Sequence, residues 1–381
     1  MLNYFDHTAT KLMDQDVIDY FAKQLKNNNY NSAARYSSGI EAAASIEEST
    51  KKISSLLGAN TSEVIYTSGG SESINTALKG IVFAPNPKHK RILTTAGEHA
   101  ATIESLKFIK DQLGYSIDIC DLNKHGMVDL GQVKKYLSNY NYDLLTLIHV
   151  NNVLGSVNPI EAIVDLRNRL QADLPIHLDA VQSLGKIPFN FKDLGVELAS
   201  FSLHKIGAPK GIGLLLKSDK IRLEPLIHGG GQQNNLRSGT ENPAMIATIA
   251  YLLEKIHENF HEKIRIEKEL KTYFIQNLLA AAVNFHLISP EDALPQIISI
   301  CFPELRAETL LNILDRDKIS ISIGSACSNK KSEQNSVLRN LKLPNHMDQH
   351  ILRISIDRLN TKEEIDYLVI KIKEALAKYA I

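Results

Sequence analysis

The chain has 381 residues, of which 44% are hydrophobic and 23% are charged. This length and apolar content suffice to bury a large core and favour more than one domain. The 43 basic and 43 acidic residues cancel to a formal net charge of zero, which argues against a nucleic-acid-binding protein because such proteins usually carry a basic excess.

Short apolar runs and helical segments alternate through the first two thirds of the chain. Strands are predicted over residues 63–67, 91–95, 143–150, 175–179, 198–202 and 211–216. The run at 143–150 is almost continuously apolar, as in a strand that is buried on both faces. This alternation is typical of an α/β fold whose mostly parallel sheet is covered by helices.

The last third of the chain predicts a smaller α+β unit. A long helix from Asn242-Pro243 to about Leu279 leads into strands near 296–302, 319–323 and 352–356. A closing helix begins at Thr361, where Thr361 and Glu364 form a capping-box pattern. Its apolar residues repeat at helical spacing on one face: Ile365, Leu368, Val369, Ile372 and Leu376.

Two strand ends carry residue types that suit a charged ligand. Residues 67–72 read Thr-Ser-Gly-Gly-Ser-Glu at a strand-to-helix junction, and backbone N–H groups at a helix N-terminus suit a phosphate. A plain strand-to-helix turn is the commoner reason for such a segment. Asp179 ends the apolar strand at 175–179, at an edge where α/β proteins place ligands. Its carboxylate can pair with a protonated ring nitrogen or cap the following helix.

A lysine and two histidines follow other predicted strands. The strand at 198–202 runs into Ser202-Leu203-His204-Lys205. Lys205 can form a Schiff base with an aldehyde cofactor, and Ser202 and His204 can donate to a phosphate. His99 follows the strand at 91–95, and its imidazole can stack on an aromatic cofactor and move protons near neutral pH, although a lone histidine there is more often structural. Together these strand ends are far more specific than each is alone.

In these blocks and others the chain resembles the NifS/IscS cysteine desulfurases, within the class V aminotransferase group of fold-type I pyridoxal-phosphate enzymes. The resemblance covers essentially the whole chain, in blocks at 5–10, 67–72, 98–99, 150–155, 177–183, 202–205, 209–213, 228–232, 237–242 and 324–327. It implies a large cofactor-binding domain over 16–255 with a mostly parallel sheet of the seven-stranded type. A smaller α+β domain over 1–15 and 256–381 would carry the loop with Cys327.

The resemblance also implies a cofactor and the residues that hold it. Pyridoxal 5′-phosphate would be bound covalently by Lys205, with Asp179 on its pyridinium nitrogen and His99 stacked on its ring. The other cofactor contacts would be Gly70, Ser71, Asn152, Gln182, Ser202 and His204, with Thr240 from the neighbouring subunit of a homodimer. Arg358 would clamp the substrate carboxylate, a task that suits a guanidinium fork, and Asn152 would assist.

Cys327 indicates which reaction the family resemblance implies. It lies in Gly324-Ser325-Ala326-Cys327-Ser328, between an apolar strand and the polar residues 329–335. A thiolate on a mobile loop can attack a sulfur inside the site and then carry a persulfide out to an acceptor. By resemblance, Cys327, Lys205 and His99 convert L-cysteine into L-alanine and a persulfide on Cys327. Cys120 and Cys301 lie in apolar contexts that are typical of structural cysteines.

The implied partner is a sulfur-acceptor protein, such as an iron–sulfur scaffold or a sulfur carrier, for iron–sulfur cluster assembly or tRNA thiolation. A transient iron–sulfur contact at Cys327 is the only metal contact expected. Another activity on the same scaffold stays open: selenocysteine lyase, cysteine-sulfinate desulfinase or another class V aminotransferase. A non-catalytic partner protein is the alternative of a different class, and the intact Lys205, Asp179 and Cys327 argue against it.

Several positions depart from the family pattern. His7 replaces a usual Asn or Tyr, Tyr36 stands near a usual His, and Asp357 stands where Gly is common. Asn234-Asn235 replaces an Arg-Gly-like pair. The first three departures are expected to affect substrate handling or rate, and they do not touch the predicted cofactor contacts.

The expected location is the cytoplasm. The three cysteines are far apart and odd in number, which does not indicate a disulfide framework. No apolar run reaches the roughly 18 residues of a membrane span, and residues 1–6 resemble neither a signal peptide nor a transit peptide. Contact with a membrane or directly with nucleic acid is therefore not expected.

Overall fold

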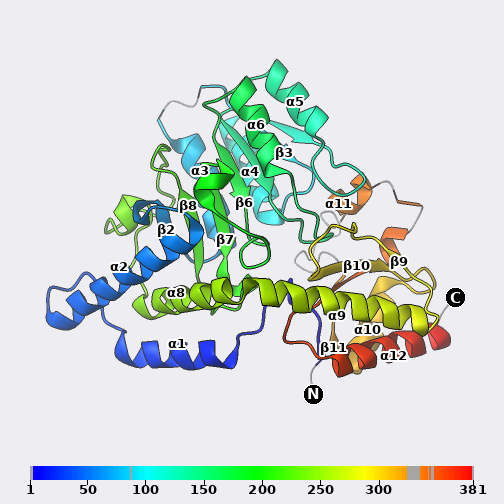
Figure 1. The fold of residues 1–381 in the computed structure, drawn as a ribbon. Helices are drawn as coiled ribbons and strands as arrows, with labels where there is room; N and C mark the ends of the chain where they lie inside the picture. The colour runs from blue at the N-terminus through cyan, green and yellow to red at the C-terminus, as the bar shows by residue number, and fades with distance from the viewer. Residues whose placement is uncertain (1–2, 86–87, 324–334, 342, 345–346, 380–381) are drawn as a thin grey trace.

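A central sheet of seven strands has the order β2–β8–β7–β6–β5–β3–β4. The computed structural model describes residues 3–85, 88–323, 335–341, 343–344 and 347–379 (Figure 1). Every neighbouring pair in the sheet is parallel except the two pairs of β8, which runs antiparallel to β2 and β7. The predicted α/β fold with a mostly parallel sheet is confirmed. The strands are β2 Val64–Thr67, β3 Arg91–Thr95, β4 Ser116–Cys120, β5 Leu144–Ile148, β6 Ile176–Asp179, β7 Leu198–Ser202 and β8 Gly213–Lys217.

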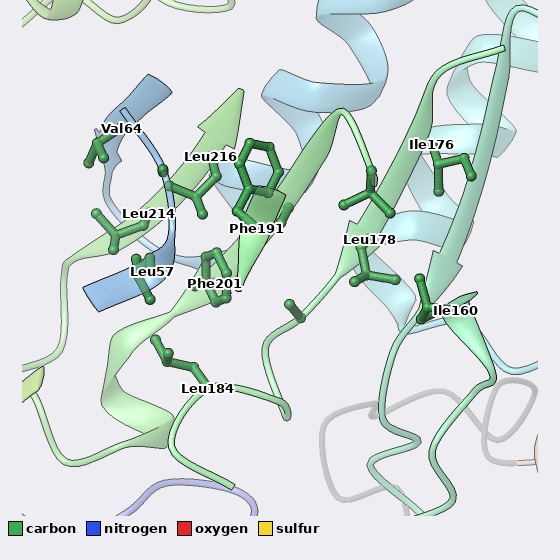
Figure 2. Close-up of a cluster of buried hydrophobic side chains, with 14 of the residues drawn as sticks. Leu57, Val64, Ile160, Ile176, Leu178, Leu184, Phe191, Phe201, Leu214 and Leu216 are labelled. Carbon is green, nitrogen blue, oxygen red and sulfur yellow. The ribbon is translucent and has the colours of Figure 1, made fainter. Parts of the chain in front are cut away.

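Helices cover both faces of this sheet. Successive side chains of a strand point to opposite faces, so the apolar residues of one strand pack against helices on both sides. Val64 and Tyr66 of β2 enter one core, while Ile65 enters another with α3 and α4. Figure 2 shows part of the first core, where Phe201 and Leu214 pack among other apolar side chains. The helices of this part are α1 Gln15–Asn27, α2 Ser37–Leu57, α3 Gly70–Phe83, α4 Ala100–Leu113, α5 Leu130–Asn139, α6 Ile160–Leu170, α7 Phe191–Leu194 and α8 Pro243–Glu258.

The rest of the chain builds a smaller unit with its own apolar core. An antiparallel sheet has the order β12–β10–β9, and β1 pairs in parallel with β11. Phe5 from the N-terminal segment enters the same core as Phe274 of α9 and Ile354 of β12. The division at 15/16 and 255/256 stays a prediction. The elements are β1 Asn3–Tyr4, α9 Phe260–Ala280, β9 His286–Leu287, β10 Ile297–Cys301, α10 Ala307–Arg316, β11 Ile319–Ser320, α11 Asn335–Asn340, β12 Ile351–Ser355 and α12 Lys362–Tyr379.

Two element predictions were wrong and one was confirmed in detail. The long helix predicted to reach Leu279 is two helices, α8 and α9, which lie end to end in Figure 1. They meet at Asn259, whose side-chain amide donates to the Lys255 carbonyl and whose φ of −105° leaves the helical range. Strand β4, a five-residue strand at the edge of the sheet, was not predicted. The capping box is present, with both Thr361–Glu364 bonds made.

None of the helices in the described ranges is long and apolar enough to cross a membrane.

Candidate active site

A cavity of about 590 Å³ lies at the carboxyl ends of β5, β6 and β7, the edge where open α/β sheets bind ligands. The N-terminal segment closes one side through Thr8 and Ala9, and β12 contributes Arg353. The structure brings into this wall every residue predicted to contact a cofactor except Thr240: Gly70, Ser71, His99, Asn152, Asp179, Gln182, Ser202, His204 and Lys205.

One end of the cavity is formed by the junction of β2 and α3. A side-chain carbon at Gly70 would lie 3.0 Å from Cβ of Ser202 and 3.1 Å from Cγ2 of Val181. Glycine therefore lets the α3 N-terminus approach the end of β7 closely. The N–H groups of that helix end, with the hydroxyls of Ser71 and Ser202, form a donor set suited to an anion.

His204 lies between this end and the N-terminal segment. Its Nδ1 is 3.0 Å from the hydroxyl oxygen of Thr10, and its backbone carbonyl accepts from the N–H of Lys11 at 3.1 Å. Burial, and then the neighbouring charge of Lys205, lower its pKa to about 4. The imidazole is therefore neutral at neutral pH and has one N–H donor.

Asp179 and His99 form another part of the wall. Asp179 ends β6, is 2% exposed, and accepts from the backbone N–H of Val181 at 3.1 Å. Burial raises its pKa, while His99 and Lys205 oppose the rise. His99 is the N-cap of α4, and its Nδ1 accepts from the Ala101 N–H at 3.1 Å. This bond fixes the ring and leaves Nε2 to carry the proton of the neutral form.

Lys205 reaches the N-terminal segment with its amine. Nζ donates to the carbonyl of Ala9 at 2.7 Å and to the carbonyl of Thr8 at 3.0 Å. Gln182 donates to the same Thr8 carbonyl at 3.1 Å and accepts from Lys186. The segment thus holds two predicted site residues through its backbone, a kind of contact that leaves no sequence motif.

The arginine that lines the cavity is not the one predicted to clamp the substrate. Arg358 does not line the cavity; it pairs with Asp14, which also pairs with Lys255. Arg353, which was not singled out from the sequence, lines the cavity instead. It donates to Asp6 at 2.8 Å and to the carbonyl of Asn152 at 3.0 Å. Its Nε is buried and has no hydrogen-bond partner among the described residues.

A signal for Arg353 was present in the sequence. It stands inside the apolar run of β12, and the whole strand is buried. A buried arginine must have anionic or carbonyl partners, so its position marks a polar site within the fold. Arg358 follows the strand end and is 30% exposed in its side chain.

Other predicted residues lie elsewhere. Thr240 is exposed and away from the cavity wall, and its predicted role requires a second subunit. Cys327 and its flanking residues lie outside the described residues. Cys120 and Cys301 are buried, and burial raises their pKa to about 12 and about 11. Within the described ranges no three His, Cys, Asp or Glu side chains are grouped as a metal site requires.

Glu98 is a buried acid beside this cavity, and it leads to a prediction about pH. Its carboxylate accepts from Thr95 at 2.5 Å and from the Ile148 N–H at 3.1 Å. Burial raises its pKa from an ordinary 4.5 to about 8. Between these two values the folded protein keeps a proton that the unfolded chain releases. Stability contributed by this group is therefore full below pH 4.5 and declines as the pH rises toward 8.

Glu98→Gln is expected to remove that decline, since glutamine keeps the acceptor oxygen and cannot ionise. Thermal unfolding of cofactor-free protein, compared between variant and wild type from pH 5 to 8.5, measures the effect. The Tm of the variant minus the Tm of wild type should increase as the pH rises. Glu291→Gln, at an exposed site, is the control and should give a constant difference. A constant difference for Glu98→Gln as well would contradict the raised pKa.

The chain matches the aminotransferase class-V family model over residues 3–368. The cysteine desulfurase IscS of Dictyoglomus turgidum is 34% identical over 376 residues, covering 98% of this chain and 94% of that protein. A NifS/IcsS protein homolog of Lactobacillus delbrueckii subsp. bulgaricus is 35% identical over 372 residues, covering 96% and 95%. Among solved structures, a NifS-like protein has a TM-score of 0.91 at 32% identity, covering 99% of this chain and 100% of its own.

Proposed function

The chain belongs to the aminotransferase class-V family, and from this membership and its full-length desulfurase relatives we infer that it is a cysteine desulfurase. It converts L-cysteine into L-alanine and hands the sulfur to an acceptor. The observation that carries this function is the convergence of Lys205, Asp179, His99 and Arg353 on one cavity. A solved structure of SspA in complex with cysteine, 27% identical with a TM-score of 0.80, covers 94% of this chain and 99% of its own.

Pyridoxal 5′-phosphate is the cofactor that the wall fits. The N-terminus of α3, Ser71, Ser202 and His204 would hold its phosphate, and Lys205 would bind it covalently. Asp179 is fully buried, and burial raises its pKa. A protonated ring nitrogen beside it would supply the positive charge that stabilises a buried carboxylate. His99 would lie against the ring, and Asn152 and Gln182 would contact it at the edge. When bound, this cofactor supplies an electron sink for the substrate's α-carbon.

The chain's own groups would carry the remaining chemistry. Arg353 would bind the substrate carboxylate through a guanidinium whose buried Nε has no hydrogen-bond partner among the described residues. Lys205 would take the proton from the α-carbon and return it. The Cys327 thiolate would attack the substrate sulfur, so that an S–S bond forms while the C–S bond breaks. The electron pair of the broken bond stays with carbon, which gains a proton and leaves as alanine.

Two features of the assembly complete the proposal. A homodimer would bring the exposed Thr240 of one subunit to the phosphate of its partner's cofactor. The persulfide would pass to an acceptor protein, such as an iron–sulfur scaffold or a sulfur carrier. IscS relatives over the full chain support this class of partner.

Cys327→Ala tests the persulfide step. Wild type, given cysteine and a thiol reductant, is expected to release sulfide and alanine in equal amounts. The variant should lose sulfide release by at least about a hundredfold, because no thiolate is left to take the sulfur. Cys120→Ala, which removes a buried thiol, is the matched control and should keep the ratio of products.

Alanine that forms without dependence on Cys327 would overturn the persulfide role. It would point instead to a lyase of the selenocysteine or cysteine-sulfinate kind, which can be tested with those two substrates directly. The cofactor is checked in the same samples by absorption near roughly 400–430 nm, where a protonated pyridoxal linkage to lysine absorbs.

A further inference from the structure

A second, smaller cavity lies next to Lys205. Its volume of about 20 Å³ exceeds the roughly 10–15 Å³ that a buried water needs. Thr8 and Lys205 line both this inner cavity and the active-site cavity, so the two spaces meet at the Lys205 side chain. The other charged or titratable residues of its wall are His7, Lys11, Lys186, Lys263 and Asp357.

His7 is a buried group in the wall of the inner cavity, where Oε1 of Gln296 also has no hydrogen-bond partner among the described residues. It is 5% exposed, and neither ring nitrogen has a hydrogen-bond partner in the described part of the chain. The ring packs edge-on against Tyr4, with 4.9 Å between centroids. Burial lowers its pKa, while Asp357 opposes the fall and Lys11 adds to it. The imidazole is therefore neutral at neutral pH, and it needs one donor and one acceptor.

The wall beyond His7 is a chain of buried charges. Nζ of Lys11 is 3.0 Å from Oδ2 of Asp357, and both side chains are almost fully buried. Nζ of Lys263 is 2.7 Å from Oε1 of Glu267, which is completely buried. A buried site with several exchangeable protons is suited to proton transfer through hydrogen bonds.

An outer cavity connects this cluster with the surface. Its volume is about 190 Å³, and it shares Lys11, Ile206, Ile256 and Lys263 with the inner cavity. Asn259 and Glu262 line it from exposed positions around the start of α9. The active-site cavity, the inner cavity and the outer cavity are therefore neighbours that share wall residues, from Lys205 to the exposed positions at the start of α9.

We propose that the inner cavity holds a bound water and that this water, with His7, exchanges protons between Lys205 and the solvent of the outer cavity. The inference rests on the proposed function, in which Lys205 takes and returns the α-proton. Each transfer breaks one N–H or O–H bond and forms another, without any oxidant or reductant. The conversion of cysteine into alanine and a persulfide neither consumes nor releases a proton overall. The path therefore determines whether Lys205 returns the abstracted proton or one from solvent, and it does not change the number of protons.

The isotope content of the product tests the path. Wild type that converts ordinary cysteine in D₂O should give alanine rich in deuterium at Cα, because Lys205 exchanges before it returns a proton. His7→Phe keeps a ring against Tyr4 and removes both nitrogens. It should lower the Cα deuterium content toward roughly two thirds, the fraction returned by an amine that holds two deuterons and the abstracted proton. A purely structural defect reduces the amount of alanine and leaves its isotope ratio unchanged.

Two further variants make the comparison specific. His7→Gln keeps a donor and an acceptor and should retain most of the deuterium content. Ile256→Val alters an apolar wall residue of the same cavities and should match wild type. Unchanged deuterium in alanine from His7→Phe overturns the proposal. Wild type that makes no alanine contradicts the proposed function instead, and the two failures are thus distinguishable.

A measurement without turnover gives the second readout. A crystal structure of the cofactor-free wild type should have water density within hydrogen-bond distance of a His7 ring nitrogen, with a further polar partner on the cavity wall. A dry inner cavity overturns the proposal, whatever the fate of the His7→Phe variant during folding.

Discussion

Lys205→Ala is expected to reduce formation of alanine and sulfide from cysteine by at least about a thousandfold, because one side chain has two tasks. Lys205 would bind the cofactor covalently and would also move the proton at the substrate's α-carbon. Its amine lies in the wall beside Asp179 and His99 and is held by the carbonyls of Thr8 and Ala9. The same variant should release its cofactor on dialysis, as absorption spectra of the dialysed protein would record.

Lys210→Ala is the matched control, since Lys210 also lines the cavity. It follows η2 (Leu203–Lys205) by a few residues and is exposed. Loss of its charge should weaken cofactor binding and leave the chemical step intact at saturating cofactor. If Lys210→Ala abolished the reaction while Lys205→Ala spared it, the assignment of the anchoring lysine would be wrong.

The fold could be predicted where burial leaves a local pattern. Strand β5 is a mostly apolar run and β6 alternates apolar with polar residues; both are buried along their whole length, and the sequence marks β5 clearly. The pairing order cannot be read in this way. Strand β8 lies between β2 and β7 and runs antiparallel to both, a non-local arrangement that depends on tertiary packing.

The site shows the same division between local and distant information. Asp179 ends β6 and Lys205 stands three residues after β7, so the sequence indicates both their type and their position. The contacts of the N-terminal segment were not predicted, because they use the backbone carbonyls of Thr8 and Ala9. The buried ion pair of Lys11 with Asp357 joins residues at opposite ends of the chain, and no local sequence pattern predicts it.

The sequence interpretation chose Arg358 as the clamp, and the structure places Arg353, five positions earlier, in the cavity wall. Both arginines belong to one motif, and each offers a guanidinium that could bind a carboxylate. The strand ends at Ser355, so Arg353 is held inside the sheet while Arg358 lies beyond it. Only the packing of β12 against β10 and the N-terminal segment decides which of the two faces the cavity.

Arg353→Lys is therefore expected to lower kcat/KM for cysteine by about 10²- to 10³-fold, mainly through a higher KM. Lysine keeps the charge and loses the fork that binds a carboxylate through two parallel bonds. Cysteine methyl ester sharpens the measurement, because it lacks the anionic carboxylate. Wild type should strongly prefer cysteine to the ester, and Arg353→Lys should lose most of that preference.

Arg358→Ala provides the matched comparison. Its partner Asp14 keeps Lys255 at 2.8 Å, and Arg358 itself is partly exposed, so unfolding should become easier by only about 1 kcal/mol or less. The preference for cysteine over its ester should remain. Asp6→Asn separates the effect of losing the Arg353–Asp6 ion pair from the effect of losing the guanidinium. It removes the ion-pair partner of Arg353 and keeps the guanidinium in place. The opposite result would be that Arg358→Ala loses the preference for cysteine over its ester while Arg353→Lys keeps it. Arg358 would then be the residue that binds the substrate carboxylate, and the end of β12 would have to move when substrate binds.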